Sequence, residues 1–405
     1  MGPVIDFTIP PELEELRAKV AAFVGDEVLP AEAGLAEDDL EVVLQPLRKR
    51  AREAGLWTPH LPPEWGGLGV GPLGMALISQ ECGASALASL ALNAMAPDEG
   101  NMRLLLHAGT EEQKETYLRP LAAGEMRSCF AMTERAAGSD PTMLRTTATA
   151  DGEGWVLDGE KWFISGANGA GFAIVVAVTD PEAESRHRRH SLFLADAGTP
   201  GWKVVREIPV MGTHGPGGHC EVLLESCRVP ADALLGERGA GLALAQARLG
   251  PARLAHAMRW IGMAQRALDL AAARALDRET FGRALSEHQA VQWMLADSAT
   301  QLYAARLMVL HAAWKIETGQ GHRQEVAFVK VFVSEALGDI VDRALQIHGA
   351  LGYSEDLPLE RFYRDARAAR LYDGPSEVHR MAIARALLKA AEETGTTRPA
   401  LGGLA

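Results

Sequence analysis

One acidic residue near the C-terminus stands in a sequence context that suits a catalytic base. Asp373 lies between Tyr372 and Gly374, and Pro375 then prevents a helix from continuing through the stretch. Gly374 has no Cβ, so a ligand could approach the backbone closely there. Residues 362–370, just before it, are rich in arginine. The pattern predicts a carboxylate on a loop between two helices, and it fits either a base or an ordinary capped turn.

Three further stretches combine residue types that suit a planar heterocycle and a phosphate. Residues 130–140 run from apolar residues to Gly138 and Ser139, where exposed N–H groups could cradle a pyrophosphate. Residues 161–166 place two aromatic side chains and a hydroxyl at the end of a strand, which suits stacking on a ring. Residues 278–289 form a polar turn whose arginines could hold a phosphate. The alternative readings are a linker, a pair of core aromatics and a helix cap.

The elements that would position these residues fall into four segments. We predict a helical domain over residues 1–124 and a β-domain over 125–236, because the hydrophobic period changes between them. An Ala- and Leu-rich helical period then predicts a bundle over 237–393. The Gly- and Thr-rich residues 394–405 predict a loose tail.

The β-domain shows its turns in the sequence. Asp151-Gly152 predicts a hairpin, and Asp158-Gly159 predicts a second turn before the next strand. Strands are expected at 146–150, 155–157, 161–164, 174–178, 191–194 and 221–224. The sheet is expected to be antiparallel.

Composition excludes several classes of protein. The 405 residues carry a net charge of -13, which argues against nucleic-acid binding and against docking on an anionic membrane. No apolar run is long enough to span a membrane. The four cysteines form no CxxC pair, and His214, His219 and Cys220 lack metal-ligand spacing, so neither a disulfide framework nor a metal site is predicted. Residues 1–6 show no secretory signal, and a cytoplasmic location is expected.

Four patches together resemble one family. Residues 130–140, 163–165, 278–289 and 346–353 occur in the order and spacing found in the acyl-CoA dehydrogenases, and the resemblance covers residues 5–390. The runs 248–253 and 373–379 look most similar to the subfamily whose animal members act on long or branched chains. The resemblance implies an α+β, mostly α fold: an N-terminal helical domain, a central antiparallel β-domain and a C-terminal four-helix bundle.

The resemblance also implies FAD as the cofactor. Phe163 would stack on the flavin ring, and Ser165 would bond near its N5. Arg278 and Phe281 would hold the adenylate half of an FAD in a neighbouring subunit, so the site would depend on a homo-oligomer, with a tetramer favoured over a dimer. The residues implied for FAD are Phe130, Met132, Thr133, Gly138, Ser139, Phe163, Ile164, Ser165, Arg278, Phe281, Gln289, Gln346, Ile347, Gly349, Pro375 and Glu377.

By the same resemblance, Asp373 is the base that removes the α-proton of an acyl-CoA thioester while a hydride leaves Cβ for the flavin. Arg253 would lie near the base and the thioester, where its charge could keep Asp373 ionised. The substrate contacts implied are Ser139, Tyr372, Gly374 and Arg253. Most members carry Glu at the base position, and Asp is shorter by about 1.5 Å of reach. The family's other base position falls within residues 244–253, which contain no acid.

Three readings of the function remain at this point. The first is an FAD-dependent acyl-CoA dehydrogenase that passes its electrons to an electron-transfer flavoprotein. The second is a nitroalkane-oxidase-like flavoprotein, since those enzymes resemble the family and use an Asp base. The third is a non-catalytic acyl-CoA-binding scaffold, which the intact candidate residues disfavour. The basic run 186–190 could contact CoA or simply be a solvated loop.

Overall fold

The computed structural model describes residues 8–32, 40–212 and 215–401. Residues 1–6, on which the signal-sequence prediction rests, and His214 therefore lie outside the described residues. The chain forms two compact units. We call residues 1–57, 70–92 and 254–359 the helical unit, and residues 58–69, 93–253 and 360–405 the sheet unit.

Among its described residues, the sheet unit contains eight strands in one sheet. Its hairpin at Asp151-Gly152 is confirmed, with Gly152 at φ +61° and β2 antiparallel to β3. Most neighbouring strands are antiparallel, but β1 and β2 each pair with β4 in parallel. The strands are β1 (Ser128–Ala131), β2 (Thr147–Asp151), β3 (Gly154–Ser165), β4 (Phe172–Val178), β5 (His190–Asp196), β6 (Trp202–Glu207), β7 (His219–Pro230) and β8 (Leu234–Leu235).

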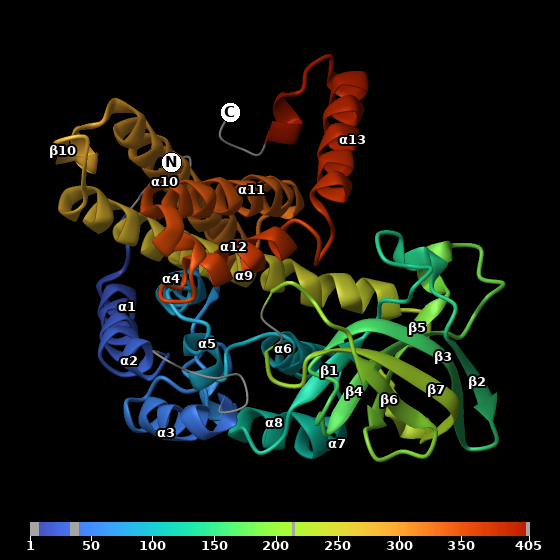
Figure 1. The fold of residues 1–405 in the computed structure, drawn as a ribbon. Helices are drawn as coiled ribbons and strands as arrows, with labels where there is room; N and C mark the ends of the chain where they lie inside the picture. The colour runs from blue at the N-terminus through green and yellow to red at the C-terminus, as the bar shows by residue number, and fades with distance from the viewer. Residues whose placement is uncertain (1–7, 33–39, 213–214, 402–405) are drawn as a thin grey trace. The chain divides into compact units, whose positions relative to one another are not determined.

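Strand β4 is buried on both faces, which explains its unbroken apolar run. Successive side chains of a strand point to opposite faces. Phe172 and Ile174 pack with residues of α6 (Asp98–Ala108) and α8 (Arg119–Ala123), which cover that face (Figure 1). Ala173 and Val175 point the other way, into a core formed by the sheet itself. The central strand is therefore covered on both sides, as its composition requires.

The second predicted turn, at Asp158-Gly159, is wrong. Strand β3 continues through these residues, and the register against β7 shifts between Leu157 and Gly159, which marks a bulge. Gly159 is needed because a Cβ there would lie 2.5 Å from Thr146 Oγ1. An Asp-Gly pair supplies the unusual backbone that a bulge needs as readily as that of a turn, so the sequence pattern did not separate the two.

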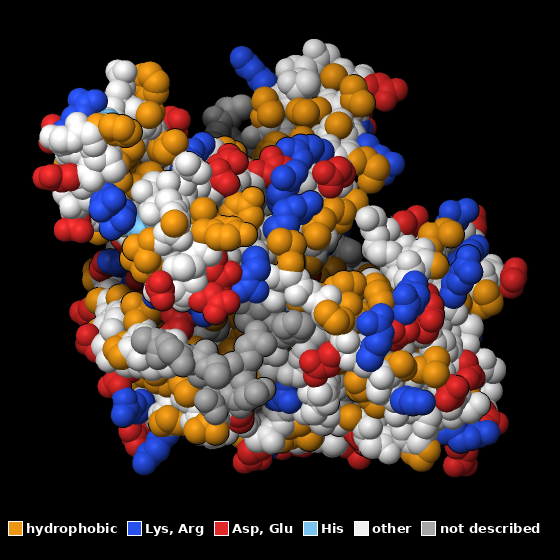
Figure 2. Space-filling view, in the orientation of Figure 1, with side chains coloured by type: hydrophobic (Ala, Val, Ile, Leu, Met, Phe, Trp, Pro, Cys, Tyr) orange, Lys and Arg blue, Asp and Glu red, His pale blue; other side chains and the backbone are white. Residues whose placement is uncertain are grey.

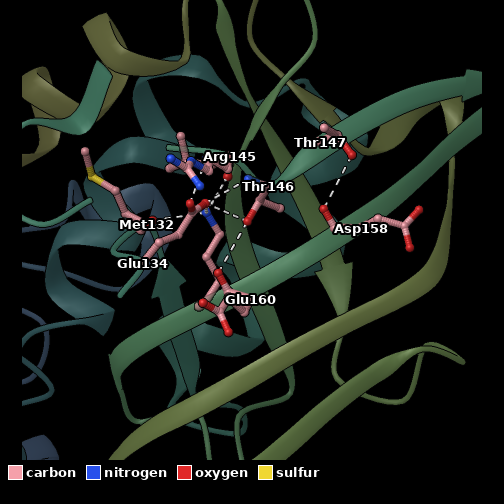
Figure 3. Close-up of polar contacts among 9 residues, drawn as sticks. Met132, Glu134, Arg145, Thr146, Thr147, Asp158 and Glu160 are labelled. Carbon is pink, nitrogen blue, oxygen red and sulfur yellow. Dashed lines mark hydrogen bonds and ion pairs between the residues drawn. The ribbon is translucent and has the colours of Figure 1, made fainter. Parts of the chain in front are cut away.

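A buried lysine ties several segments of the sheet unit together. Lys161 is fully buried, and its ammonium donates to Met132 O at 3.0 Å, Val176 O at 2.8 Å and Glu134 Oε1 at 2.9 Å. Glu134 also accepts from Arg145 N, Thr146 N and Thr146 Oγ1 (Figure 3). All three donors of the ammonium are thus matched by an acceptor.

Burial lowers the pKa of Lys161 to about 8, and the charge of Glu134 opposes that shift. For Glu134, burial raises the pKa, but the charge of Lys161 and the bonds from Thr146 outweigh it, so the pKa lies below its ordinary value. Both groups are therefore charged at neutral pH. The pair fixes the chain on either side of Thr133.

Helical segments complete the sheet unit. They are η3 (Pro63–Trp65), α6, α7 (Glu111–Gln113), η4 (Lys114–Leu118), α8, η5 (Pro141–Met143), η6 (Arg186–Arg188), η7 (Ala231–Ala233), the start of α9 (Gly241–Asp277), most of α12 (Leu359–Ala369), α13 (Ser376–Thr394) and η10 (Arg398–Leu401). The tail expected to be loose contains the short helix η10, with Ala400 buried.

The helical unit is built from long, closely packed helices. A Cβ on Gly83 would lie 2.1 Å from Arg259 O, and one on Gly262 would lie 2.0 Å from Gln80 O, so α4 and α9 meet backbone to backbone. Helices α10 and α11 lie side by side (Figure 1). The remaining elements are α1 (Pro11–Phe23), η1 (Val24–Val28), α2 (Leu29–Glu32), α3 (Leu40–Glu53), α4 (Pro72–Cys82), α5 (Ala88–Ala91), β9 (Glu279–Thr280), β10 (Arg283–Ala284), η8 (Leu285–Glu287), α10 (Gln289–Glu317), α11 (Arg323–His348) and η9 (Gly349–Tyr353).

The face of the molecule shown in Figure 2 carries charges of both signs. Figure 2 shows Lys and Arg side chains interspersed with Asp and Glu side chains on the face in view. Within the described ranges, none of the helices has the length and hydropathy needed to cross a membrane.

The buried ion pair predicts a specific loss of stability. Lys161→Met should lower the free energy of unfolding by roughly 3–5 kcal/mol, because it leaves the Glu134 carboxylate buried without its cation. Urea-induced unfolding of the purified protein measures this loss.

Lys389→Met is the matched control. Lys389 pairs with Glu393 at 3.7 Å on an exposed face of α13, so its loss should cost less than about 1 kcal/mol. If the two variants unfolded at the same urea concentration, the buried pair would not be the stabilising contact described here.

Candidate active site

Asp373 lies on the loop between α12 and α13, as the sequence predicts. The loop is closed by Leu371 N donating to Ala368 O at 2.8 Å and Ser376 N donating to Arg370 O at 3.1 Å. Asp373 has φ +55° and Gly374 has φ +90°, so both residues adopt the left-handed conformation. A non-glycine residue rarely stays there unless its surroundings hold it.

Two side chains hold the carbonyl of Asp373. Arg253 Nε on α9 donates to Asp373 O at 2.8 Å, and His379 Nε2 on α13 lies 3.2 Å from the same oxygen. The structure thus brings together Arg253 and Asp373, but the guanidinium hydrogen-bonds the backbone. Burial lowers the pKa of Arg253, and the charge of Asp373 opposes that shift. The charges of the Asp373 carboxylate and the Arg253 guanidinium therefore interact.

A second cation near Asp373 was missed from the sequence. Arg248 lies one and a half turns before Arg253 on α9 and is buried, with its guanidinium 4.2 Å above the ring of Phe130. Burial lowers the pKa of Arg248, and Asp373, Glu99 and Asp98 oppose the shift in that order. The run 248–253 contains both arginines, and the sequence reading assigned a role to Arg253 alone.

A chain of buried hydrogen bonds orients Arg248. Its Nε donates to Asn101 Oδ1 at 2.9 Å, and its Nη2 donates to Pro97 O at 3.2 Å. Asn101 Nδ2 donates to Ser128 Oγ at 2.9 Å, and Ser128 Oγ donates to Asp98 Oδ1 at 2.6 Å. The guanidinium is therefore fixed to α6 and to the first residue of β1.

Hydrogen bonds to two backbone carbonyls fix the segment that we expect at the edge of the flavin ring. Lys161 binds Met132 O, and Trp162 N donates to Thr133 O at 2.8 Å. Phe130 and the side chains of Met132 and Thr133 are partly exposed. The backbone of this segment is thus rigid, while its side chains remain accessible to a ligand.

Phe163 is the most unusual residue of β3. It has φ +57°, and its ring is 45% exposed although it lies within a strand. The register of β3 against β7 is irregular between Lys161 and Ile164, and this irregularity allows Phe163 to leave the alternating pattern. Its ring is therefore available for stacking on a ligand.

The residues after Phe163 divide between core and surface. The side chain of Ile164 is buried in the core, so only its backbone could serve the cofactor. Ser165 Oγ lies 2.9 Å from His219 Nδ1, a partner that the sequence did not indicate. Gly138 and Ser139 lie on an exposed turn. In the basic run, Arg186–Arg188 forms a short 3-10 helix, whereas His190 is a buried residue of β5.

The base loop also carries Tyr372, Pro375 and Glu377. Tyr372 is partly exposed, and Pro375 is the residue before the first turn of α13. Glu377 lies in that first turn and is exposed, where an acid complements the helix dipole. Ser376 Oγ is buried and has no hydrogen-bond partner within the described part of the chain. A polar group of a ligand could satisfy it.

Another six candidate residues belong to the helical unit. Phe281 and Gly282 form a tight turn with φ +53° and +79°, and the side chain of Phe281 is 99% exposed. Arg278 and Gln289 are exposed at the ends of the two long helices that this turn connects. Gln346, Ile347 and Gly349 close α11, with Gln346 exposed and Ile347 buried.

The candidate residues thus divide between the two units. Within residues 8–32, 40–212 and 215–401, no group of three or more His, Cys, Asp or Glu side chains is arranged to hold a metal ion.

Family comparisons match three consecutive parts of the chain. The acyl-CoA dehydrogenase N-terminal domain matches residues 10–125, the middle domain matches residues 129–227, and the C-terminal domain matches residues 239–388.

Two curated relatives are similar over almost the whole chain. The Mycobacterium tuberculosis protein named "Probable acyl-CoA dehydrogenase FadE2" is 40% identical, over 96% of this chain and 98% of its own length. The human protein "Acyl-CoA dehydrogenase family member 11" is 38% identical over 92% of this chain. The chain spans about half of that relative's length, since the match covers 50% of it.

Solved structures share the fold. A structure from Mycobacterium abscessus, of a protein assigned as an acyl-CoA dehydrogenase, has a TM-score of 0.89 at 38% identity, over 96% of this chain and 100% of its own. A structure of PigA with FAD and proline has a TM-score of 0.83 at 26% identity, over 94% and 98% of the two chains. The fold expected from the sequence is therefore confirmed, and the chain belongs to the acyl-CoA dehydrogenase family of enzymes.

Proposed function

We propose that this protein converts an acyl-CoA thioester to the trans-2-enoyl-CoA in an FAD-dependent α,β-dehydrogenation, with Asp373 as the base. The observation that supports the proposal is the left-handed backbone of Asp373. Two side chains, one half-buried and one buried, contact its carbonyl oxygen. Strain of this kind persists where function needs a side chain in one place. The family provides the reaction type.

The residues present fit FAD. Phe163 has an exposed ring that can stack on a ligand. Ser376 Oγ, at the end of the base loop, is buried without a hydrogen-bond partner in the described residues and can bind a polar group of a ligand. The hydroxyls of Thr133, Ser139 and Ser165 supply donors for a ring edge and a pyrophosphate. In the helical unit, Phe281 is fully exposed and would be covered by the adenylate half of an FAD.

The remaining residues proposed for FAD act through side chains or backbone according to their burial. The side chains of Ile164 and Ile347 are buried, so these two residues would contribute backbone groups. The others are Phe130, Met132, Gly138, Arg278, Gln289, Gln346, Gly349, Pro375 and Glu377. FAD, when bound, supplies the acceptor for the hydride that leaves Cβ.

In the proposed step, the carboxylate of Asp373 accepts the α-proton and becomes a neutral acid, while the Cα–H electron pair becomes part of the new Cα–Cβ double bond. The N–H of Asp373 would donate to the thioester oxygen, where negative charge develops. Arg248 and Arg253 favour the ionised carboxylate beforehand. Ser139, Tyr372, Gly374 and Arg253 would contact the substrate.

We also propose the organisation that the family resemblance implies. The domain boundaries are 1–124, 125–236 and 237–393, followed by the tail 394–405. The assembly is a homo-oligomer, with a tetramer favoured, and the electron acceptor is an electron-transfer flavoprotein in the cytoplasm. A long or branched acyl chain is the favoured substrate class.

An anaerobic titration tests the reaction. The visible absorption of the bound flavin should bleach when a panel of acyl-CoAs is added without oxygen, and the chain class that bleaches it fastest identifies the substrate. Preference for short straight chains would overturn the favoured chain class. Bleaching by a nitroalkane and by no thioester would replace the proposal with the nitroalkane-oxidase reading.

Asp373→Asn tests the base. Loss of the carboxylate should slow flavin reduction by about 10²–10⁴-fold, because general base catalysis supplies a factor of this size. FAD content and acyl-CoA binding should be unchanged. Asp151→Asn, which removes an exposed acid from β2, is the control and should reduce at the wild-type rate. Rapid reduction in Asp373→Asn would remove Asp373 from this role.

Arg248→Met tests the second cation. Removing its charge makes ionisation of Asp373 less favourable, so the acid limb of the pH profile for flavin reduction should move to higher pH by roughly one unit. Arg228→Met, which removes an exposed guanidinium on β7, should leave the profile in place. A shift of the same size in both variants would argue against a local effect of Arg248.

A further inference from the structure

We propose that His379 is a positioning residue: its imidazole and the guanidinium of Arg253 together hold the carbonyl of Asp373 and so fix the loop that presents the carboxylate. The consequence for catalysis rests on the proposed function of Asp373. The structural part, that His379 stabilises this loop, stands on the contacts alone.

The contact between His379 and the loop has a defined donor. A carbonyl oxygen can only accept a hydrogen bond, so the Nε2 atom 3.2 Å from Asp373 O carries the proton. His379 is buried, and its amide donates to Pro375 O at 3.2 Å as part of the first turn of α13. The ring thus reaches back from the helix to the loop before it.

The absence of a side chain at Gly374 leaves room for the imidazole of His379. A Cβ built on Gly374 would lie 2.9 Å from His379 Nε2, closer than real Cβ contacts come. Its φ of +90° also disfavours any residue with a side chain. The space that glycine leaves open is therefore occupied by the imidazole, so the ring and the glycine form one packed arrangement.

Two donors from two helices restrain one peptide plane. Arg253 belongs to α9 and His379 to α13, and together they can fill both lone pairs of Asp373 O. The hydrogen bond from the charged guanidinium is the stronger of the two. The left-handed backbone of Asp373 is a conformation that residues with a side chain seldom adopt. Both hydrogen bonds act against rotation of this peptide out of that conformation.

The restraint matters because Asp is a short base. A Glu has an additional torsion with which to adjust its carboxylate, whereas an Asp carboxylate follows its backbone closely. A rotation about the backbone of residue 373 would therefore carry the carboxylate away from the α-carbon. Misplacement by about 1 Å can cost on the order of 10²-fold in rate.

The experiment compares His379→Leu with His379→Gln in the full-length holoenzyme. Leu removes the donor and keeps an apolar side chain in the buried site, whereas the amide of Gln can still donate to the carbonyl. Hydrogen exchange measured by mass spectrometry on the peptide containing residues 370–376 reports the loop directly. Anaerobic flavin reduction by the best acyl-CoA of the wild-type panel reports the chemistry.

We expect faster exchange of the loop peptide in His379→Leu, with flavin reduction slowed on the order of 10²-fold at unchanged FAD content and unchanged acyl-CoA dissociation constant. His379→Gln should restore most of both properties. Loop exchange equal to wild type in His379→Leu would overturn the proposal, and so would a Gln variant no better than Leu.

Gly374→Ala provides an independent variant if His379→Leu does not fold. Its methyl group would displace the imidazole while leaving His379 itself in place, so the loop should again exchange faster; wild-type exchange in this variant would overturn the proposal. The proposed function and the proposed role of His379 can be refuted independently of each other. If no acyl-CoA reduces the wild-type flavin, the proposed function falls, while loop exchange still decides whether His379 holds the loop.

Discussion

A positive charge in the interior must be surrounded by oxygen atoms, and in the sheet unit this requirement fixes several segments that are distant in sequence. The ammonium of Lys161 takes its acceptors from the loop at Met132, from β4 at Val176 and from Glu134. An uncompensated charge there would cost several kcal/mol. The segment 132–134 consequently cannot shift without exposing an unmatched donor. This is the segment expected to line the cofactor, and its position is fixed by a fully buried lysine.

The same requirement operates around Arg248, with a different consequence. Its guanidinium is fixed by Asn101 and by a main-chain carbonyl, and Asn101 is in turn bonded to Ser128 at the start of β1. The cation thereby acquires a defined position next to Phe130 and an electrostatic influence on Asp373. Lys161 fixes the position of the backbone at residues 132–134, while Arg248 contributes to the electrostatic environment of Asp373. Both depend on polar atoms that are buried and hydrogen-bonded.

Patterns that are local in sequence predicted the local structure well. The hairpin at Asp151-Gly152, the long helices and the loop carrying Asp373 follow from period and turn chemistry. The bulge at Gly159 could not be predicted in this way. It depends on a close approach to Thr146, and no local sequence pattern indicates such an approach. Arg248 and His379 were missed for a related reason. An arginine on a helix usually points to solvent, and only the folded structure shows which arginines face inward. Arg248 and His379 make tertiary contacts, which neither the hydrophobic period nor the composition of the sequence predicts.

The presence of Asp, and not Glu, at the position proposed for the base has a structural counterpart in these contacts. Shortening a side chain by one methylene removes a torsion as well as reach, so the placement of the carboxylate becomes a property of the main chain. The main chain at residue 373 is in turn held in a conformation that L-residues avoid. Hydrogen bonds to its carbonyl from Arg253 on α9 and His379 on α13 restrain this main chain. The charge of Asp373 opposes the fall in the pKa of Arg248 that burial causes, so the two groups stabilise each other's charged form.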